Sequence, residues 1–220
     1  MRHRLTKRDM KVINFLNQNQ SLISSSEQLC KLFFSENSKS EESARVITRR
    51  RMNALVEHGE VNVYCRGLGL SNLYYTTKRR SLPKNINHVL MMTEALVKLK
   101  ESGIYFDTKN VFTEVSIKDI RCDFIIREAE YGGIPVSIVI EVENTKSISQ
   151  DKLDILQQIK KERKQGLHLD VLQNSVMILI VQDKELQPEQ KQKFFYTDTE
   201  FSNITCIRNA IQRVILQLEK

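Results

Sequence analysis

The segments IRCDFII (residues 120–126) and VSIVIEVENTK (residues 136–146) each place acidic residues inside a run of apolar ones. Both runs are rich in β-branched and aromatic residues, which predicts two short strands. An ionised carboxylate in such surroundings is costly unless a metal ion or hydrogen-bond donors hold it. Asp123 lies within the first run, and Glu141 and Glu143 share one face of the second. These acids indicate a site for a hard divalent cation, or the remains of one. The alternative is that Glu141 and Glu143 face solvent where the strand ends.

The elements predicted around these two strands belong to an α/β core. Gly132-Gly133 lies between the strands, so they are expected to be antiparallel neighbours. The uninterrupted apolar run 176–181 is typical of a strand that is covered on both faces. The predicted elements are a helix over 86–102, strands over 111–117, 120–127 and 136–143, a helix over 150–164, strands over 176–181 and 204–207, and a helix over 209–219.

The first eighty residues follow a different plan, three helices and a hairpin. Thr6 can cap a helix that runs to about residue 17, and Ser24-Ser25-Ser26-Glu27 has the form of a capping box for a second helix. A third helix is predicted from about residue 41 to residue 58, ended by Gly59. Two β-rich runs, 61–65 and 73–77, flank the glycine-containing loop 66–72. This order is that of a winged helix-turn-helix, in which the third helix enters the major groove of DNA.

The positive charge of the chain is concentrated in this first part. The net charge is +7, and residues 1–82 hold 15 Lys and Arg against 7 Asp and Glu, a net of +8. Residues 83–220 have a net charge of −1. A basic module joined to a nearly neutral one indicates that the first module contacts a polyanion. We therefore predict two domains, 1–82 and 83–220, separated by a basic linker that contains Pro83.

Candidate DNA contacts are basic or hydroxyl side chains of the third helix, the hairpin loop and the linker. Arginine pairs with guanine or phosphate, and a threonine hydroxyl can contact either. Because consecutive helical residues point in different directions, at most two of the three arginines at 49–51 are expected to face DNA. The candidates are Arg45, Thr48, Arg49, Arg50, Arg51, Arg66, Lys78, Arg79 and Arg80.

Composition excludes several other classes of protein. No apolar run approaches the roughly 20 residues of a membrane span, and the basic N-terminus has no apolar segment of the kind found in secretory signals. The four cysteines form no CxxC pair, which argues against a zinc site or a disulfide framework. We expect a cytoplasmic protein that does not bind membranes.

The predicted order α-β-β-β-α-β resembles the core of the PD-(D/E)xK restriction-endonuclease-like superfamily. That resemblance places Asp123 and Glu141 at the metal-binding pair, with Mg²⁺ or Mn²⁺ as the cofactor. It implies a lysine two residues after Glu141, where this chain has Glu143, while Lys146 follows three residues later. If the site is active, the catalytic residues are Asp123, Glu141, Glu143 and Lys146. The departure from the pattern is equally compatible with a degenerate domain that does not cleave DNA.

The chain also resembles the replication-relaxation family of Gram-positive mobile elements, which includes MobC-type relaxosome components. The resemblance covers roughly residues 5–160. It lies in Leu5-Thr6-Lys7-Arg8-Asp9, Arg49 to Val61, Leu73 to Thr77, His88, Cys122-Asp123-Phe124 and Glu141 to Lys146. It implies a winged helix followed by an endonuclease-like domain, with a role in opening, nicking or positioning DNA at an origin.

Three functions follow as hypotheses. The first is a DNA-binding accessory protein of plasmid or mobile-element mobilisation, conjugation or replication, which binds origin-like duplex DNA and recruits a relaxase or a replication initiator. The second is a Mg²⁺- or Mn²⁺-dependent endonuclease or nickase. The third is a winged-helix transcriptional regulator whose C-terminal domain mediates dimerisation or effector binding.

Overall fold

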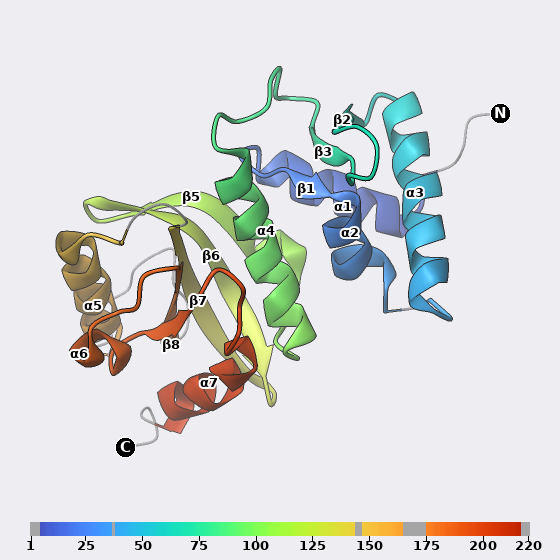
Figure 1. Ribbon diagram of the computed structural model, residues 1–220. Coiled ribbons are helices and arrows are strands. Elements are labelled where there is room, and N and C mark those ends of the chain that lie inside the picture. The colour runs from blue at the N-terminus through green and yellow to red at the C-terminus, as the bar shows by residue number, and fades with distance from the viewer. Residues whose placement is uncertain (1–4, 37, 144–146, 165–174, 217–220) are drawn as a thin grey trace. The chain divides into compact units, whose positions relative to one another are not determined.

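The computed structural model combines α-helices with two β-sheets, which confirms the predicted α+β class (Figure 1). It describes residues 5–36, 38–143, 147–164 and 175–216. The chain divides into two compact units, Met1–Val97 and Lys98–Lys220. This division lies inside helix α4 (Ile86–Glu101), later than the predicted boundary at residues 82/83. Most of α4 belongs to the first unit because Thr93 donates a hydrogen bond to the Ile23 carbonyl (2.9 Å) and Gln28 donates one to the Leu90 carbonyl (2.9 Å).

The first unit contains the predicted three helices and hairpin, together with a short additional strand. Its elements are α1 (Lys7–Gln18), β1 (Ser24–Ser25), α2 (Ser26–Leu29), a π-helical turn (Cys30–Phe34), α3 (Glu41–Glu57), β2 (Val61–Tyr64) and β3 (Leu73–Thr76). The strands form an antiparallel sheet in the order β1-β3-β2. Gly59 follows α3 with a φ of 70°, a left-handed conformation that favours glycine, so the predicted helix end is confirmed.

Side-chain caps set the beginnings of the first two helices. Thr6 caps α1 as predicted: its hydroxyl accepts a hydrogen bond from the Asp9 N–H (3.2 Å), and the Asp9 carboxylate accepts one from the Thr6 N–H (2.6 Å). The cap predicted for α2 is wrong by one residue, because Ser25 and Gln28 form the capping box. Ser24 instead pairs with Tyr74 in the sheet, which moves the helix start one position along the chain.

The second unit is built on one mixed sheet. Its strands are β4 (Tyr105–Phe106), β5 (Val111–Ile117), β6 (Ile120–Tyr131), β7 (Ile134–Glu143), β8 (Ser175–Gln182) and β9 (Phe195–Thr197). The sheet order is β4-β6-β7-β8-β9, and β5 also pairs with β6. β6 and β7 are antiparallel neighbours as predicted, whereas β7, β8 and β9 run parallel.

Helices of the second unit bury the apolar side chains of this sheet. A 3₁₀ turn (Thr108–Asn110) precedes β5, and helices α5 (Gln150–Lys164), α6 (Pro188–Lys191) and α7 (Ile207–Leu216) follow in the second half. Leu153, Leu156 and Ile159 of α5 pack in one cluster with Val139 of β7 and with alternate residues of β8. All residues from Val176 to Val181 are buried, so the prediction of a strand covered on both faces is confirmed.

The predicted strand over 204–207 is wrong. Ile204–Cys206 form a 3₁₀ turn, and Ile207 is the first residue of α7. Ile207, Ile211 and Ile215 recur at intervals of four residues and are all buried, so they form the apolar side of a helix that packs against β6 and β8. Among the residues described, no helix is long and apolar enough to cross a membrane.

Candidate nucleic-acid interface and acidic cluster

Helix α3 presents the greatest density of candidate DNA contacts. Ser40 caps it by accepting a hydrogen bond from the Ser43 N–H (3.1 Å), and Glu41 and Glu42 in the first turn favour the positive end of the helix dipole. The buried side consists of Ala44, Thr48, Met52 and Leu55. The other side therefore faces solvent, and the arginines predicted as DNA contacts divide according to their partners.

Two of these arginines are engaged in ion pairs. Arg45 is exposed but lies 2.7 Å from the Glu41 carboxylate on the preceding turn. Arg51 points inward and pairs with Asp9, whose side chain is fully buried. Burial alone would raise the pKa of Asp9, but hydrogen bonds from Arg51 and Thr6 outweigh it and hold that pKa below its usual value. Arg51 therefore joins α3 to α1, and we leave it out of the proposed interface.

Arg49 and Arg50 differ from these two residues. Both side chains are exposed. Within the described part of the chain, neither makes an ion pair or a hydrogen bond. Their charge is thus available to an external anion.

Thr48 is the candidate that the structure places in the core. Its side chain is completely buried, and its hydroxyl donates a hydrogen bond of 2.7 Å to the Ala44 carbonyl one turn earlier. This satisfies the hydroxyl inside the helix. We assign Thr48 a packing role and do not include it in the interface.

The basic residues beyond α3 also differ in their surroundings. Arg66 in the hairpin loop, Lys78 and Arg80 are exposed. Arg79 donates hydrogen bonds to the carbonyls of Ser81 (2.7 Å) and Ser21 (3.2 Å). It therefore ties the segment after β3 to the segment after α1, a structural task that sequence reasoning did not anticipate.

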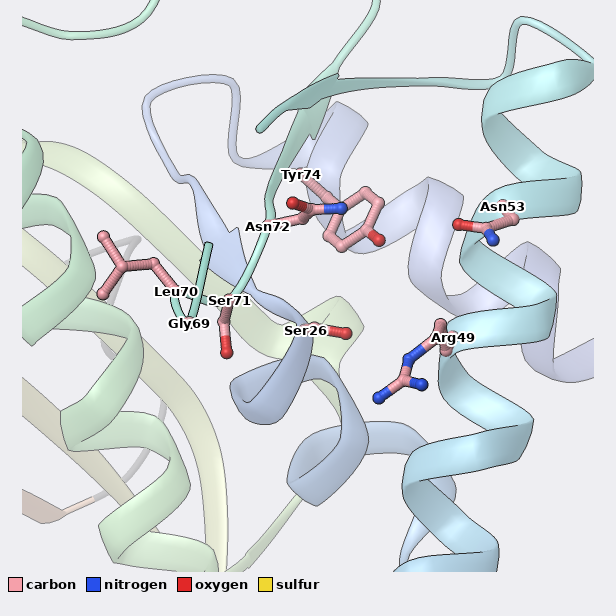
Figure 2. Close-up of a pocket in the computed structure, with 8 residues that line it drawn as sticks. All are labelled: Ser26, Arg49, Asn53, Gly69, Leu70, Ser71, Asn72 and Tyr74. Atoms are coloured by element: carbon pink, nitrogen blue, oxygen red, sulfur yellow. The ribbon is translucent and has the colours of Figure 1, made fainter. Parts of the chain in front are cut away.

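A pocket of about 380 Å³ lies between α3 and the loop that leads into β3 (Figure 2). Arg49 and Asn53 project into it from α3, and Ser26, Ser71 and Asn72 line it from the other side. Tyr74 is buried and lines the pocket together with Asn72 and Ser26. Burial raises the pKa of Tyr74 above its ordinary value, so its hydroxyl is neutral and able to donate.

The second candidate site is the acidic cluster that we define as Asp123, Glu141 and Lys152, all within the second unit. Phe124 pairs with Ile140 across β6 and β7, and this register brings Asp123 next to Glu141 at the adjoining position. The Asp123 carboxylate accepts a hydrogen bond of 2.7 Å from the Val142 N–H. The two predicted acids are therefore brought together.

Lys152 of α5 supplies the positive charge at this cluster. Its Nζ lies 2.6 Å from Glu141 Oε2, and the Glu141 side chain is only 1% exposed. The other oxygen, Oε1, is buried and has no hydrogen-bond partner among the described residues. Burial and the charge of Asp123 raise the pKa of Glu141 to about 7, although Lys152 acts in the opposite direction. Glu141 is buried, so the solvent-facing alternative is wrong for this residue.

The remaining predicted members of the site are Glu143 and Lys146. Glu143 is half-buried at the end of β7, where it pairs in register with Gln182 of β8. Lys146 lies outside the described residues. Lys152 was missed because only the packing of α5 against the sheet brings it to Glu141. Its one sequence signal is that it directly precedes Leu153, the first buried residue of α5.

The cluster partly fits a hard cation. Mg²⁺ is commonly held by one or two carboxylates with water completing the shell, and Asp123 and Glu141 are two carboxylates on adjacent strands. No group of three or more acidic, histidine or cysteine side chains suited to a metal occurs in the described part of the chain. Lys152 already balances the charge of Glu141. Any cation would therefore share Glu141 with this lysine.

Comparison with known proteins found no matching family model, no matching curated protein and no matching solved structure.

Proposed function

We propose that this protein is a DNA-binding accessory factor of plasmid or mobile-element mobilisation or replication. In this proposal the first unit is a winged helix that binds origin-like duplex DNA. α3 enters the major groove and the β2–β3 loop lies along the backbone. The second unit has a nuclease-like frame that holds DNA or recruits a relaxase or a replication initiator.

One observation carries the proposal: Arg49 and Arg50 are exposed on α3 and have no acidic partner among the described residues. An acid one turn away can neutralise an arginine on a helix, as Glu41 does for Arg45, and no acid occupies those positions for Arg49 or Arg50. The unpaired arginines also belong to the strongly basic part of the chain. Phosphate binding uses such charges directly, because each neutralised phosphate releases counterions.

The proposal is tested with duplexes tiled across the DNA that flanks the coding sequence. Fluorescence anisotropy with the full chain should reveal tighter binding to one region than to random duplex of equal length. Arg50→Ala should weaken binding, whereas Arg213→Ala, which removes an exposed arginine of α7 in the second unit, should change it little. Equal affinity for every duplex would count against an origin-binding role, and no affinity for DNA would refute the proposal.

The acidic cluster favours a second candidate function, metal-dependent cleavage or nicking of DNA. Its support is the buried Glu141 Oε1 that lacks a partner, next to Asp123 and Lys152. A bound Mg²⁺ or Mn²⁺ would supply Lewis-acid activation of water beside a phosphate. Asp123 and Glu141 would hold the ion, and Lys152 would hold a proton or an anionic oxygen next to Glu141.

Supercoiled plasmid incubated with the protein and Mn²⁺ tests this second candidate. Nicking that is lost in Asp123→Ala and in Lys152→Met, but kept in Lys161→Met on an exposed position of α5, would support it. Plasmid that stays supercoiled across a series of divalent ions would leave the second unit as a scaffold.

A further inference from the structure

The face of α3 that borders the pocket carries side chains that can read bases as well as phosphates. Arg49 and Arg50 lie three and four residues after Val46 and four and three residues before Asn53, so the four side chains form one stripe. All four are exposed, and Val46 is unusually so for an apolar residue at 53%. The stripe therefore combines two guanidinium groups, the carboxamide of Asn53 and the methyl groups of Val46 on one surface.

Arg49 and Asn53 differ from Arg50 in their position, because both line the pocket beside the β2–β3 loop. Figure 2 shows the two side chains projecting from α3 into the same space, opposite Ser26 and Tyr74. As with Arg49, the described residues provide no hydrogen-bond partner for Asn53. A guanidinium and a carboxamide that have no partner among the described residues and line one concave surface are suited to hydrogen bonding with an external planar partner.

From these positions we infer that Arg49 and Asn53 determine sequence specificity by reading two purines of one DNA strand, a guanine and an adenine. The inference rests on the proposed function and states which DNA bases the exposed face of α3 recognises. Arginine donates two hydrogen bonds to guanine O6 and N7, and asparagine donates to and accepts from adenine N7 and N6. Both patterns are unique to the major groove.

The spacing of the two residues limits where these purines lie. Four residues of α-helix rise about 6 Å, and successive base pairs of one strand are about 3.4 Å apart. The guanine and the adenine should therefore be one or two steps apart. Ser71 and Asn72 line the opposite wall of the pocket. Their hydroxyl and amide groups can donate hydrogen bonds to the DNA phosphate that lies between the guanine and the adenine.

Arg50 serves as the internal control because it is equally exposed on the same helix but does not line the pocket. A phosphate contact by Arg50 carries no sequence information, so Arg50→Ala should weaken binding to all duplexes alike. Arg49→Ala and Asn53→Ala should instead each remove the preference for one base at one position. All three residues are exposed, so each variant is expected to fold.

The experiment is a selection from a randomised duplex library with the full chain, followed by titrations of the selected site. We expect a consensus that contains guanine and adenine one or two steps apart. Replacing that guanine by 7-deazaguanine should weaken wild-type binding by roughly 5- to 150-fold and Arg49→Ala binding hardly at all. The 7-deazaadenine substitution should behave in the same way toward Asn53→Ala.

Four outcomes would overturn the inference. Salt-sensitive binding without any consensus would refute base reading and leave the proposed function standing. A consensus that is unchanged in both Arg49→Ala and Asn53→Ala would assign specificity to other residues. Competition by millimolar free dGMP or dAMP, lost in Arg49→Ala, would show that the pocket binds a mononucleotide. Absence of any DNA binding would refute both the inference and the proposed function.

Discussion

Arg51 and Asp9 connect α3 to the first turn of α1, and this ion pair makes a residue-scale prediction. Asp9 is fully buried, and Arg51 is 17% exposed. Arg51→Ala would leave a buried carboxylate without its partner, which typically costs about 3–5 kcal/mol. Denaturant unfolding followed by circular dichroism should detect this loss. Arg50→Ala, at the exposed neighbouring position, should change stability by less than about 0.5 kcal/mol.

The same pair predicts how stability depends on pH. The pKa of Asp9 is lower in the folded state than the ordinary value of 3.8, so its contribution is present above that value. It is lost as the pH falls through the lower folded pKa, where the carboxylate takes up a proton. The loss of stability below about pH 4 should therefore be smaller in Asp9→Asn than in the wild type. An identical acid profile of the two proteins would contradict this assignment.

Glu141 makes the opposite prediction, because its pKa is raised to about 7 from an ordinary 4.5. Between these two values the folded state binds the proton more tightly than the unfolded state. Glu141 therefore favours folding below about pH 4.5, and this contribution declines as the pH rises to about 7. A ¹³C NMR titration of the Glu141 carboxyl should give a midpoint near 7. A midpoint near 4.5 would contradict the burial and charge that we describe.

At the scale of single elements, helix α5 holds Lys152 at the acidic cluster by packing its apolar side on the sheet. Leu156 is fully buried in that contact. Leu156→Ala should destabilise the second unit by about 2–5 kcal/mol, measured by denaturant unfolding, while Lys161→Ala on the exposed side should have little effect. Because the first unit has a core of its own, amide exchange there should stay unchanged in Leu156→Ala. Uniform acceleration of exchange in both units would show that they unfold together.

Elements with strong local signals could be predicted from the sequence. α1 and α3 have capping residues, apolar periodicity and, for α3, a terminating glycine, and both helices lie where these signals put them. The strand expected at 204–207 failed because Ile204 and Ile207 fit a helix start as well as a strand, and only the packing of α7 distinguishes the two. β4 and β9 have two and three residues, too few to show a periodicity.

The candidate sites were predictable only where neighbouring strands or one helix face bring residues together. Asp123 and Glu141 meet because β6 and β7 are consecutive antiparallel strands. Lys152, by contrast, contacts Glu141 from helix α5. Arg51 points inward because it binds Asp9, which lies 42 positions earlier in the sequence. Thr48 was misplaced because its hydroxyl is satisfied within α3 itself. The tertiary partners Lys152 and Asp9 leave no mark in local spacing, whereas Thr48 is at helical spacing from the buried residues Ala44, Met52 and Leu55.

At the scale of the whole molecule, charge is divided between the two units. Residues 1–97 contain 16 Lys and Arg against 8 Asp and Glu, and residues 98–220 contain 18 against 19. Electrostatic attraction to a polyanion should therefore reside in the first unit. Replacing a single exposed arginine of the first unit by alanine, for example Arg66→Ala, should weaken DNA binding. The same change at Arg213 in the second unit should have little effect on titrations at fixed salt concentration.

The salt dependence of duplex binding tests the central claim, that Arg49 and Arg50 bring the protein onto DNA, most directly. The logarithm of the binding constant should fall linearly with the logarithm of the NaCl concentration. Each phosphate contact contributes about 0.9 to that slope, so the Arg49→Ala/Arg50→Ala double variant, which removes the phosphate contact of Arg50 and the base contact of Arg49, should lose about 0.9. A slope close to zero in the wild type, or one that is the same in the double variant, would contradict the account.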